Sequence, residues 1–188
     1  MTPMTDLDLS ISELPESDWE LWRDLRLEAL RDAPGAFGET LAAALERDEE
    51  SWRGVWRADP PAPRFVAGID GVPRGMCSIT FPEAFGCQPL LISMWISPAA
   101  RGRGLGPILL DACVDWCARH GYPRLRLGVV EDNEAAVRLY SRYGFRFEGT
   151  GEPLLSDPSK VVKWMDLPIE TKLSADTAEP TAVPEPTA

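Results

Sequence analysis

The segment that most constrains the fold is RGRGLG at positions 101–106, which places three glycines within six residues. It follows the nearly all-apolar run LLISMWIS at 90–97. It precedes apolar residues at helical spacing from Leu105 to Cys117. The run is typical of a central strand covered on both faces, and the spacing predicts a helix over 105–120 that ends at Gly121. A turn alone would need a single glycine, so this connection is predicted to have a second purpose.

The start of the predicted helix is suited to an anion. The first N–H groups of a helix lack intrahelical partners, and the helix dipole adds partial positive charge there. The glycines at 102, 104 and 106 allow unusual dihedral angles and leave space at the backbone, while Arg101 and Arg103 add charge. The loop is therefore predicted to hold phosphate. It lacks the endings of a Walker loop and of a GxGxxG loop, and a plain glycine-rich turn remains the alternative.

The rest of the chain mixes strand and helix signals. We expect strands at 6–11, 64–69, 74–80, 90–97, 123–130, 145–150 and 160–167. We expect helices within 15–35, where Ser17 and Glu20 have the spacing of a capping box, and over 37–56, 105–120 and 132–144. This order predicts a mixed sheet with helices on its faces.

The composition of the chain limits the classes of molecule that it is expected to bind. The formal net charge of −11 argues against nucleic acid and against an anionic membrane surface. It favours a cationic partner such as an amine, or simply solubility. No basic leader followed by an apolar run and no apolar stretch of about 20 residues is visible, so a cytoplasmic location is expected. The four cysteines form no CxxC pair and His120 is the single histidine, so buried thiols and no metal are expected.

Two motifs together point to a family. Arg-x-x-Gly-x-Gly at 101–106, after an apolar strand, resembles the acetyl-CoA signature of the GNAT acetyltransferase superfamily. Downstream, EDNEAAVRLYSRYGF resembles the family element Asn-x-x-Ala-x-x-x-Tyr-x-x-x-Gly-Phe, which is matched at Asn133, Ala136, Tyr140, Gly144 and Phe145. Two motifs in the expected order are more specific than either alone. The resemblance is strong over 88–150 and extends by element order over 5–168.

The resemblance implies a fold and a domain organisation. We expect one α/β (α+β) acetyltransferase domain over residues 1–169. Its mixed, mostly antiparallel sheet would have about six or seven strands and about four flanking helices, with two central strands that splay apart. Residues 170–188, rich in Pro, Ala, Thr and Glu, are expected to form a disordered tail.

The resemblance also implies acetyl-CoA as the cosubstrate. In the family, the pantetheine arm lies between the splayed strands like an added strand, and the glycine loop holds the pyrophosphate. Carried over residue by residue, the cofactor-binding positions are Met94, Trp95, Ile96, Arg101, Gly102, Arg103, Gly104, Leu105, Gly106, Asn133 and Tyr140. Asn133 can serve equally as the N-cap of the helix at 132–144, and the two roles are compatible.

The chemistry implied is direct attack of a neutral amine on the thioester in a ternary complex. The backbone N–H of Ile96 takes the oxyanion position and Tyr140 the general-acid position to the CoA thiolate. Helical spacing also allows Tyr140 to be a plain core residue, and Tyr143 is its local rival. The two strand positions that often carry a glutamate base fall near Leu90 and at Gly128, neither of them a carboxylate. Glu131 is the candidate base at the end of the second strand, and Glu83 or Glu39 could approach from loops over the acceptor cleft. A water chain, or an amine that binds already neutral, is the hypothesis we prefer.

The binding site for the acceptor amine is the part of the predicted active site that the sequence defines least. In the family, the first two helices, their linker and the loop between the last two strands shape it, so Phe37, Glu39 and Trp52 are candidate acceptor residues. Glu83, on a loop expected over the cleft, is the fourth candidate. An aromatic, acidic cleft would suit a small cationic amine or a peptide N-terminus, and the protein is compatible with a homodimer. Two alternatives stay open: a non-catalytic acyl-CoA sensor, and a nucleotide-phosphate-binding module.

Overall fold

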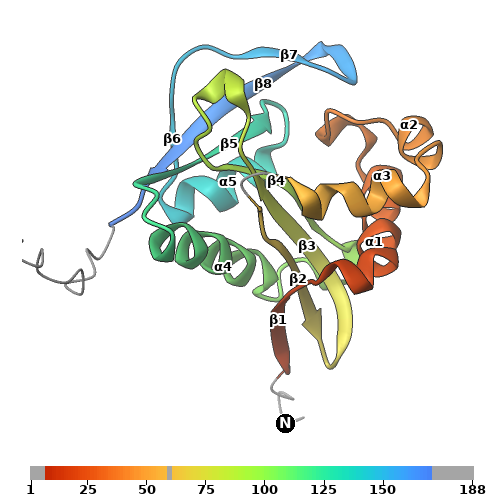
Figure 1. Cartoon of the computed structure of the whole chain (residues 1–188). Coiled ribbons are helices and arrows are strands. Elements are labelled where there is room, and N and C mark those ends of the chain that lie inside the picture. The colour runs from red at the N-terminus through yellow and green to blue at the C-terminus, as the bar shows by residue number, and fades with distance from the viewer. Residues whose placement is uncertain (1–6, 59–60, 171–188) are drawn as a thin grey trace, which may run out of the picture.

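A central sheet organises the molecule (Figure 1), whose computed structural model describes residues 7–58 and 61–170. Its eight strands run in the order β1-β2-β3-β4-β5-β8-β6, with β7 paired to β8. The strands are β1 (Leu9–Glu13), β2 (Arg64–Ile69), β3 (Val72–Thr80), β4 (Leu90–Ile96), β5 (Arg124–Val130), β6 (Arg146–Phe147), β7 (Glu152–Leu154) and β8 (Asp157–Pro168). The β4–β5 pair is parallel and the other pairs are antiparallel, so the sheet is mixed and mostly antiparallel, as predicted.

Helices cover both faces of the sheet (Figure 1). On one face lie α4 (Leu105–Arg119) and α5 (Glu134–Tyr143); on the other lie α1 (Trp19–Asp32), α2 (Leu41–Leu45) and α3 (Glu49–Arg53). Short 3-10 turns are η1 (Glu16–Asp18), η2 (Pro34–Ala36), η3 (Gly54–Arg57), η4 (Glu83–Phe85) and η5 (Pro98–Ala100). Among the described residues, no helix has the length and apolar composition needed to cross a membrane.

Side-chain alternation along the strands divides the interior into two cores. In β3, Met76 packs with the α1–α3 layer, whereas its neighbour Cys77 packs with α4. The α1–α3 core is rich in tryptophan, including Trp22 and Trp52, which are both almost fully buried. Most of the tryptophans in this layer therefore have a packing role.

Two details of the N-terminal helices differ from the sequence-based expectation. The single helical region predicted over 37–56 is wrong, because the chain forms α2, α3 and η3 instead. The Asp48 side chain accepts a hydrogen bond from the N–H of Ser51 and caps α3, so a second short helix begins here instead of α2 continuing. The capping box is also wrong: α1 begins at Trp19, and the Ser17 hydroxyl donates to Asp18 instead of capping the helix.

The C-terminal strands also differ from expectation. Only Arg146 and Phe147 of the segment predicted at 145–150 form a strand. β8 starts earlier than predicted, at Asp157, and pairs with β7, a strand that was not predicted from the sequence. The β7–β8 hairpin is visible at the top of Figure 1, where it extends beyond the body of the sheet. Of the tail predicted at 170–188, residues 171–188 lie outside the described residues.

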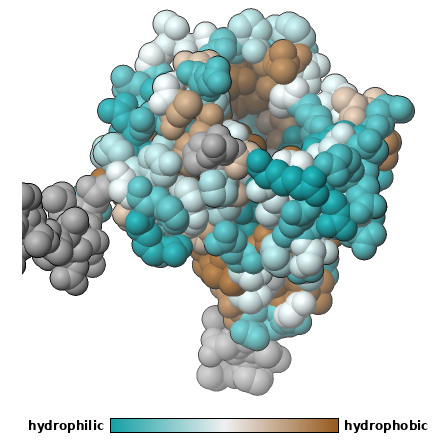
Figure 2. All heavy atoms as spheres, in the orientation of Figure 1, coloured by the Kyte–Doolittle hydropathy of each residue, from teal (hydrophilic) through white to brown (hydrophobic). Residues whose placement is uncertain are grey.

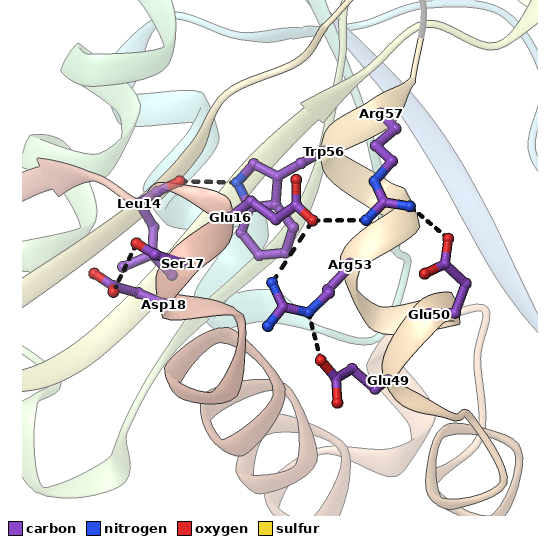
Figure 3. A network of polar contacts seen from close by, with 9 residues as sticks. All are labelled: Leu14, Glu16, Ser17, Asp18, Glu49, Glu50, Arg53, Trp56 and Arg57. Atoms are coloured by element: carbon purple, nitrogen blue, oxygen red, sulfur yellow. Dashed lines mark hydrogen bonds and ion pairs between the residues drawn. The ribbon is translucent and has the colours of Figure 1, made fainter.

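A surface network joins α3 and η3 to the turn that precedes α1 (Figure 3). Glu16 pairs with both Arg53 and Arg57, and the Trp56 indole donates to the Leu14 carbonyl over 2.9 Å. Exposed ion pairs stabilise by at most about 1 kcal/mol each, so the half-buried Trp56 bond and its packing matter more. This contact fixes the α1–α3 layer that forms one wall of the site described below.

The cysteines divide sharply by burial. Cys77, Cys113 and Cys117 are buried, with 3.4 Å between the sulfurs of Cys77 and Cys113, whereas Cys87 is exposed on the β3–β4 connection. Burial raises the pKa of Cys117 to about 12 and that of Cys113 well above its ordinary value. Within the part of the chain that the structure describes, no three His, Cys, Asp or Glu side chains are grouped as metal ligands.

Thiol accessibility gives a direct check of this packing. In the native protein, Ellman's reagent is expected to modify one thiol per chain, that of Cys87, because the other three thiols are buried. In denaturant, all four should react. More than one fast-reacting thiol in the native state would contradict the burial of the β3–α4 contact.

Candidate active site

The strands β4 and β5 separate after a short parallel contact. They pair at Leu90 with Arg126 and at Leu91 with Leu127, and not beyond. Ser93 has a φ of +57°, and the register between β3 and β4 shifts at this point, which marks a bulge. A bulge bends its strand and increases the local twist, so the second half of β4 turns away from β5. The predicted splay is confirmed, and residues 92–96 have an open edge.

The N–H of Ile96 points into the opening. The next N–H, of Ser97, donates to the Arg74 carbonyl on the β3 side over 2.7 Å. Successive backbone N–H groups of a strand alternate in direction, so the Ile96 N–H faces away from β3 and toward β5. An exposed strand edge of this kind offers donors and acceptors to an added amide chain.

The glycine loop leads from η5 into α4, and its glycines serve two purposes. Gly102 and Gly104 have φ of +75° and +94°, which L-residues with side chains rarely adopt. Gly104 is the N-cap of α4 and supplies no side-chain acceptor, so the first N–H groups remain available for another acceptor. Gly106 differs: a Cβ there would lie 3.0 Å from the Leu139 side chain, so its absence permits α4 to pack on α5 rather than leaving open space.

The two loop arginines are placed differently. Arg101 forms an ion pair with Asp32 at the end of α1, and its Nε donates to the Ile96 carbonyl over 3.1 Å. Asp32 also accepts from the Trp95 indole over 2.9 Å. The guanidinium of Arg101 therefore ties α1 to the end of β4, whereas Arg103 is exposed.

A cavity of about 380 Å³ lies beside the opening between β4 and β5. Its walls come from four places: α1 and the chain after η2, β4 from 90 to 93, β5 at 128 and 130, and the β7–β8 hairpin. Figure 2 shows the molecule hollowed on this side, with apolar surface inside. Of the four predicted acceptor residues, Phe37 and Glu39 line the cavity. Trp52 is buried beneath Arg47, and Glu83 lies on the exposed turn η4.

The charges at the α1 wall largely compensate one another. Arg26, 8% exposed, donates to Glu39 over 3.1 Å and lies over the Phe37 ring at 4.5 Å, and Arg47 also reaches Glu39, at 3.5 Å. Burial lowers the pKa of Arg26, and the carboxylate of Glu39 opposes this shift. Glu39 is therefore committed to two arginines and does not make this wall acidic.

Tyr140 lies on α5 with its side chain in the core. It is 6% exposed, and its ring meets Phe145 edge-on at 5.9 Å. Burial, followed by the nearby thiols of Cys77 and Cys113, raises its pKa above the ordinary value. Tyr143 instead donates to the Asp111 carboxylate over 2.6 Å, on the side of α5 facing α4. Burial raises the pKa of Tyr143 as well, and there the hydrogen bond to Asp111 adds to the shift, whereas for Tyr140 the nearby thiols do.

The family of this chain follows from a match to a family profile. The profile of the Acetyltransferase (GNAT) family matches residues 18–145, which include α1, the bulged strand, the glycine loop and α5. The chain belongs to the GNAT family. Both motifs that suggested this relationship lie within the matched region.

Several GNAT relatives are similar in sequence. A mycothiol acetyltransferase from Acidimicrobium ferrooxidans is 32% identical over 133 residues, covering 70% of this chain and 41% of the relative. A streptothricin acetyltransferase from Streptomyces lavendulae is 30% identical over 127 residues, covering 67% of each chain. The chain therefore spans less than half the length of the mycothiol acetyltransferase.

Solved GNAT structures share the fold. An acetyltransferase from Streptococcus pneumoniae superposes with a TM-score of 0.72 at 22% identity, covering 86% of this chain and 99% of that one. A spermidine N-acetyltransferase from Vibrio cholerae, in complex with CoA and spermine, gives 0.68 at 19% identity, covering 88% and 98%. At these identities the likeness establishes the architecture.

Two further residues predicted for the site, Asn133 and Glu131, can now be located. Asn133 is the N-cap of α5, and its side-chain oxygen accepts from the N–H of Ala136 over 3.2 Å. Glu131, the candidate base, has a side chain that is 62% exposed, with its Oε1 3.7 Å from the Nζ of Lys163. It is not among the residues that line the cavity.

Among the side chains that line the cavity, Arg26, Glu152 and Trp164 were not predicted from the sequence. Arg26 had a weak signal, because it occurs among the apolar positions of α1. Glu152 and Trp164 had none, because they meet only through the pairing of β7 with β8.

Proposed function

We propose that the protein transfers an acetyl group from acetyl-CoA to a small primary amine by direct attack in a ternary complex. The observation that carries this proposal is the open edge of β4, which lies beside an uncapped helix start at one end and a cavity at the other. The helix start suits a pyrophosphate, the strand edge suits the pantetheine amides, and the cavity suits an acceptor.

The proposed cofactor contacts follow from this arrangement. The backbone of 94–96 pairs with pantetheine, and the loop of 101–106 holds the pyrophosphate through backbone N–H groups. Because the Arg101 side chain is engaged with Asp32, its role is to fix the loop, and Arg103 is left to contact phosphate. Family membership and the CoA bound in the Vibrio cholerae structure support acetyl-CoA as the cosubstrate.

The reaction needs an oxyanion donor and a proton for the leaving group. We assign the first to the Ile96 N–H and the second to Tyr140. At neutral pH the raised pKa of Tyr140 keeps its hydroxyl protonated, so the proton remains available when the thiolate forms. Asn133, whose side-chain oxygen caps α5, retains an amide NH₂ group for the cofactor.

A small amine is the proposed acceptor. The cavity volume suits a metabolite or an antibiotic fragment better than a folded protein surface. Relatives are named for phosphinothricin, streptothricin and L-2,4-diaminobutyric acid, and the structural neighbour for spermidine. We further propose one acetyltransferase domain over residues 1–169, located in the cytoplasm and compatible with a homodimer.

Ligand binding and thiol release test the proposal together. Thermal-shift measurements should show stabilisation by acetyl-CoA and CoA and none by ATP, which a nucleotide-phosphate module would prefer. Acetyl-CoA is then incubated with phosphinothricin, L-2,4-diaminobutyrate, spermidine and a serine-initiated tripeptide, and free thiol is followed. Binding without thiol release from any of these amines would favour the sensor alternative.

A further inference from the structure

The space beside Gly128 on β5 is filled by an aromatic ring. A Cβ added at Gly128 would lie 2.8 Å from the Val162 side chain and 3.0 Å from the Trp164 ring. Gly128 is also the register partner of Trp164 on β8. No carboxylate fits on β5 at this point without displacing Trp164, so the ring takes the space beside the opening.

The same indole holds a carboxylate at the cavity. The Trp164 Nε1–H donates to Oε1 of Glu152 on β7 over 2.6 Å. Val130, Val162 and Glu152 form one row across β5, β8 and β7, and Gly128 and Trp164 form the next row, two residues along. Paired residues and residues two apart in a strand share a face, so Glu152 shares the cavity face with Gly128.

Glu152 also differs in charge environment from the other carboxylate in the cavity. Glu39 is paired with Arg26 and Arg47, whereas none of the ion pairs among the described residues includes Glu152. Its partner is a neutral indole N–H bound to one oxygen, which orients the carboxylate and leaves the second oxygen for a substrate. Of the two glutamates that line the cavity, Glu152 is therefore the one whose carboxylate is not paired with an arginine.

We propose that Glu152, oriented by Trp164, is the general base of the acetyl transfer; this rests on the proposed function. The neutral amine attacks the thioester carbon, a C–N bond forms, and the carbonyl electron pair moves to oxygen. The nitrogen, now positively charged and acidic, loses one proton to Glu152. The C–S bond then breaks as the carbonyl re-forms, and the sulfur takes a proton from Tyr140. Release of the proton from Glu152 to solvent and uptake of one by Tyr140 restore both groups, so protons and electrons balance.

The test compares Glu152→Gln with Glu148→Gln, an exposed glutamate just outside β6 that does not line the cavity. With the fastest amine of the panel above, we expect kcat of Glu152→Gln to fall about 100-fold, because a general base contributes about 10²–10⁴-fold. The KM for the amine and the Kd for acetyl-CoA should change little, since glutamine retains the acceptor for the Trp164 N–H. Glu148→Gln should match the wild type.

Two further variants separate catalysis from structure. In Glu152→Ala, added sodium formate should restore part of the lost rate, which a merely structural role would not allow. Trp164→Phe keeps a ring over Gly128 but removes the N–H, and should lower kcat less than Glu152→Gln does.

The possible outcomes distinguish the role proposed for Glu152 from the acetyl transfer on which that role rests. Full wild-type kcat in Glu152→Gln, or a rise in KM alone, would overturn the role of Glu152 and leave acetyl transfer intact. Absence of thiol release by the wild type with every amine would overturn acetyl transfer itself, and the general base with it.

Discussion

Replacing Tyr140 by phenylalanine is expected to lower kcat about 100-fold, with little change in the affinity for acetyl-CoA. The substitution removes one oxygen from a nearly buried ring and leaves the packing against Phe145 in place. The departing thiolate then has no proton donor from α5, while the backbone contacts proposed for the cofactor are untouched. The measurement is the initial rate of thiol release at saturating acetyl-CoA, with Kd from calorimetry.

Tyr143→Phe is the matched control for this prediction. It also removes a hydroxyl from α5, but one that donates to Asp111. We expect a loss of about 1 kcal/mol of stability and a kcat close to that of the wild type. If Tyr140→Phe retained full kcat across the pH range, Tyr140 would be a core residue and the proton would come from elsewhere.

Gly102→Val is expected to weaken acetyl-CoA binding about tenfold or more. Gly102 has a φ of +75° and no atom within 4 Å of an added Cβ, so the side chain would enter the space proposed for the pyrophosphate. A β-branched residue also disfavours this φ, which would move the backbone N–H groups. Loss of one charge-assisted hydrogen bond costs about 1.5–3 kcal/mol, which corresponds to at least a tenfold change in Kd.

Gly121→Val provides a control for backbone strain. Gly121 follows α4 at its opposite end, with a φ of +74° and nothing within 4 Å of an added Cβ. Both variants should lose a similar amount of stability, about 1–2 kcal/mol. A selective rise in Kd for Gly102→Val locates the anion at the helix start, whereas equal affinities in the two variants would contradict the proposed cradle.

The sequence predicted the order of the elements well where hydrophobic periodicity was strong. The run at 90–97 and the repeat from Leu105 to Cys117 became β4 and α4. The splay of β4 from β5 came from the family resemblance alone. The bulge in β4 includes a positive φ at Ser93, and a serine in the sequence does not predict that backbone conformation.

The cavity proposed for the acceptor is formed by contacts between residues far apart in the sequence, which hydrophobic periodicity does not predict. The buried Arg26 pairs with Glu39, which lies 13 residues later in the chain. A charged residue on the apolar face of a helix does not indicate which residue its partner will be. Glu152 reaches Trp164 only because the hairpin pairs β7 with β8. Glu131, chosen by its position at the end of a strand, instead lies beside Lys163.

Acetylation of an amine by this chain is tested most directly by measuring free CoA and acetylated amine in the same reaction. Each of the four amines above is supplied with acetyl-CoA, and the Cys87→Ser variant is used to remove the exposed thiol. We expect amine-dependent CoA release matched one-to-one by acetylated product for at least one of them. Saturable acetyl-CoA binding with no acetylated product from any of these amines would contradict the account.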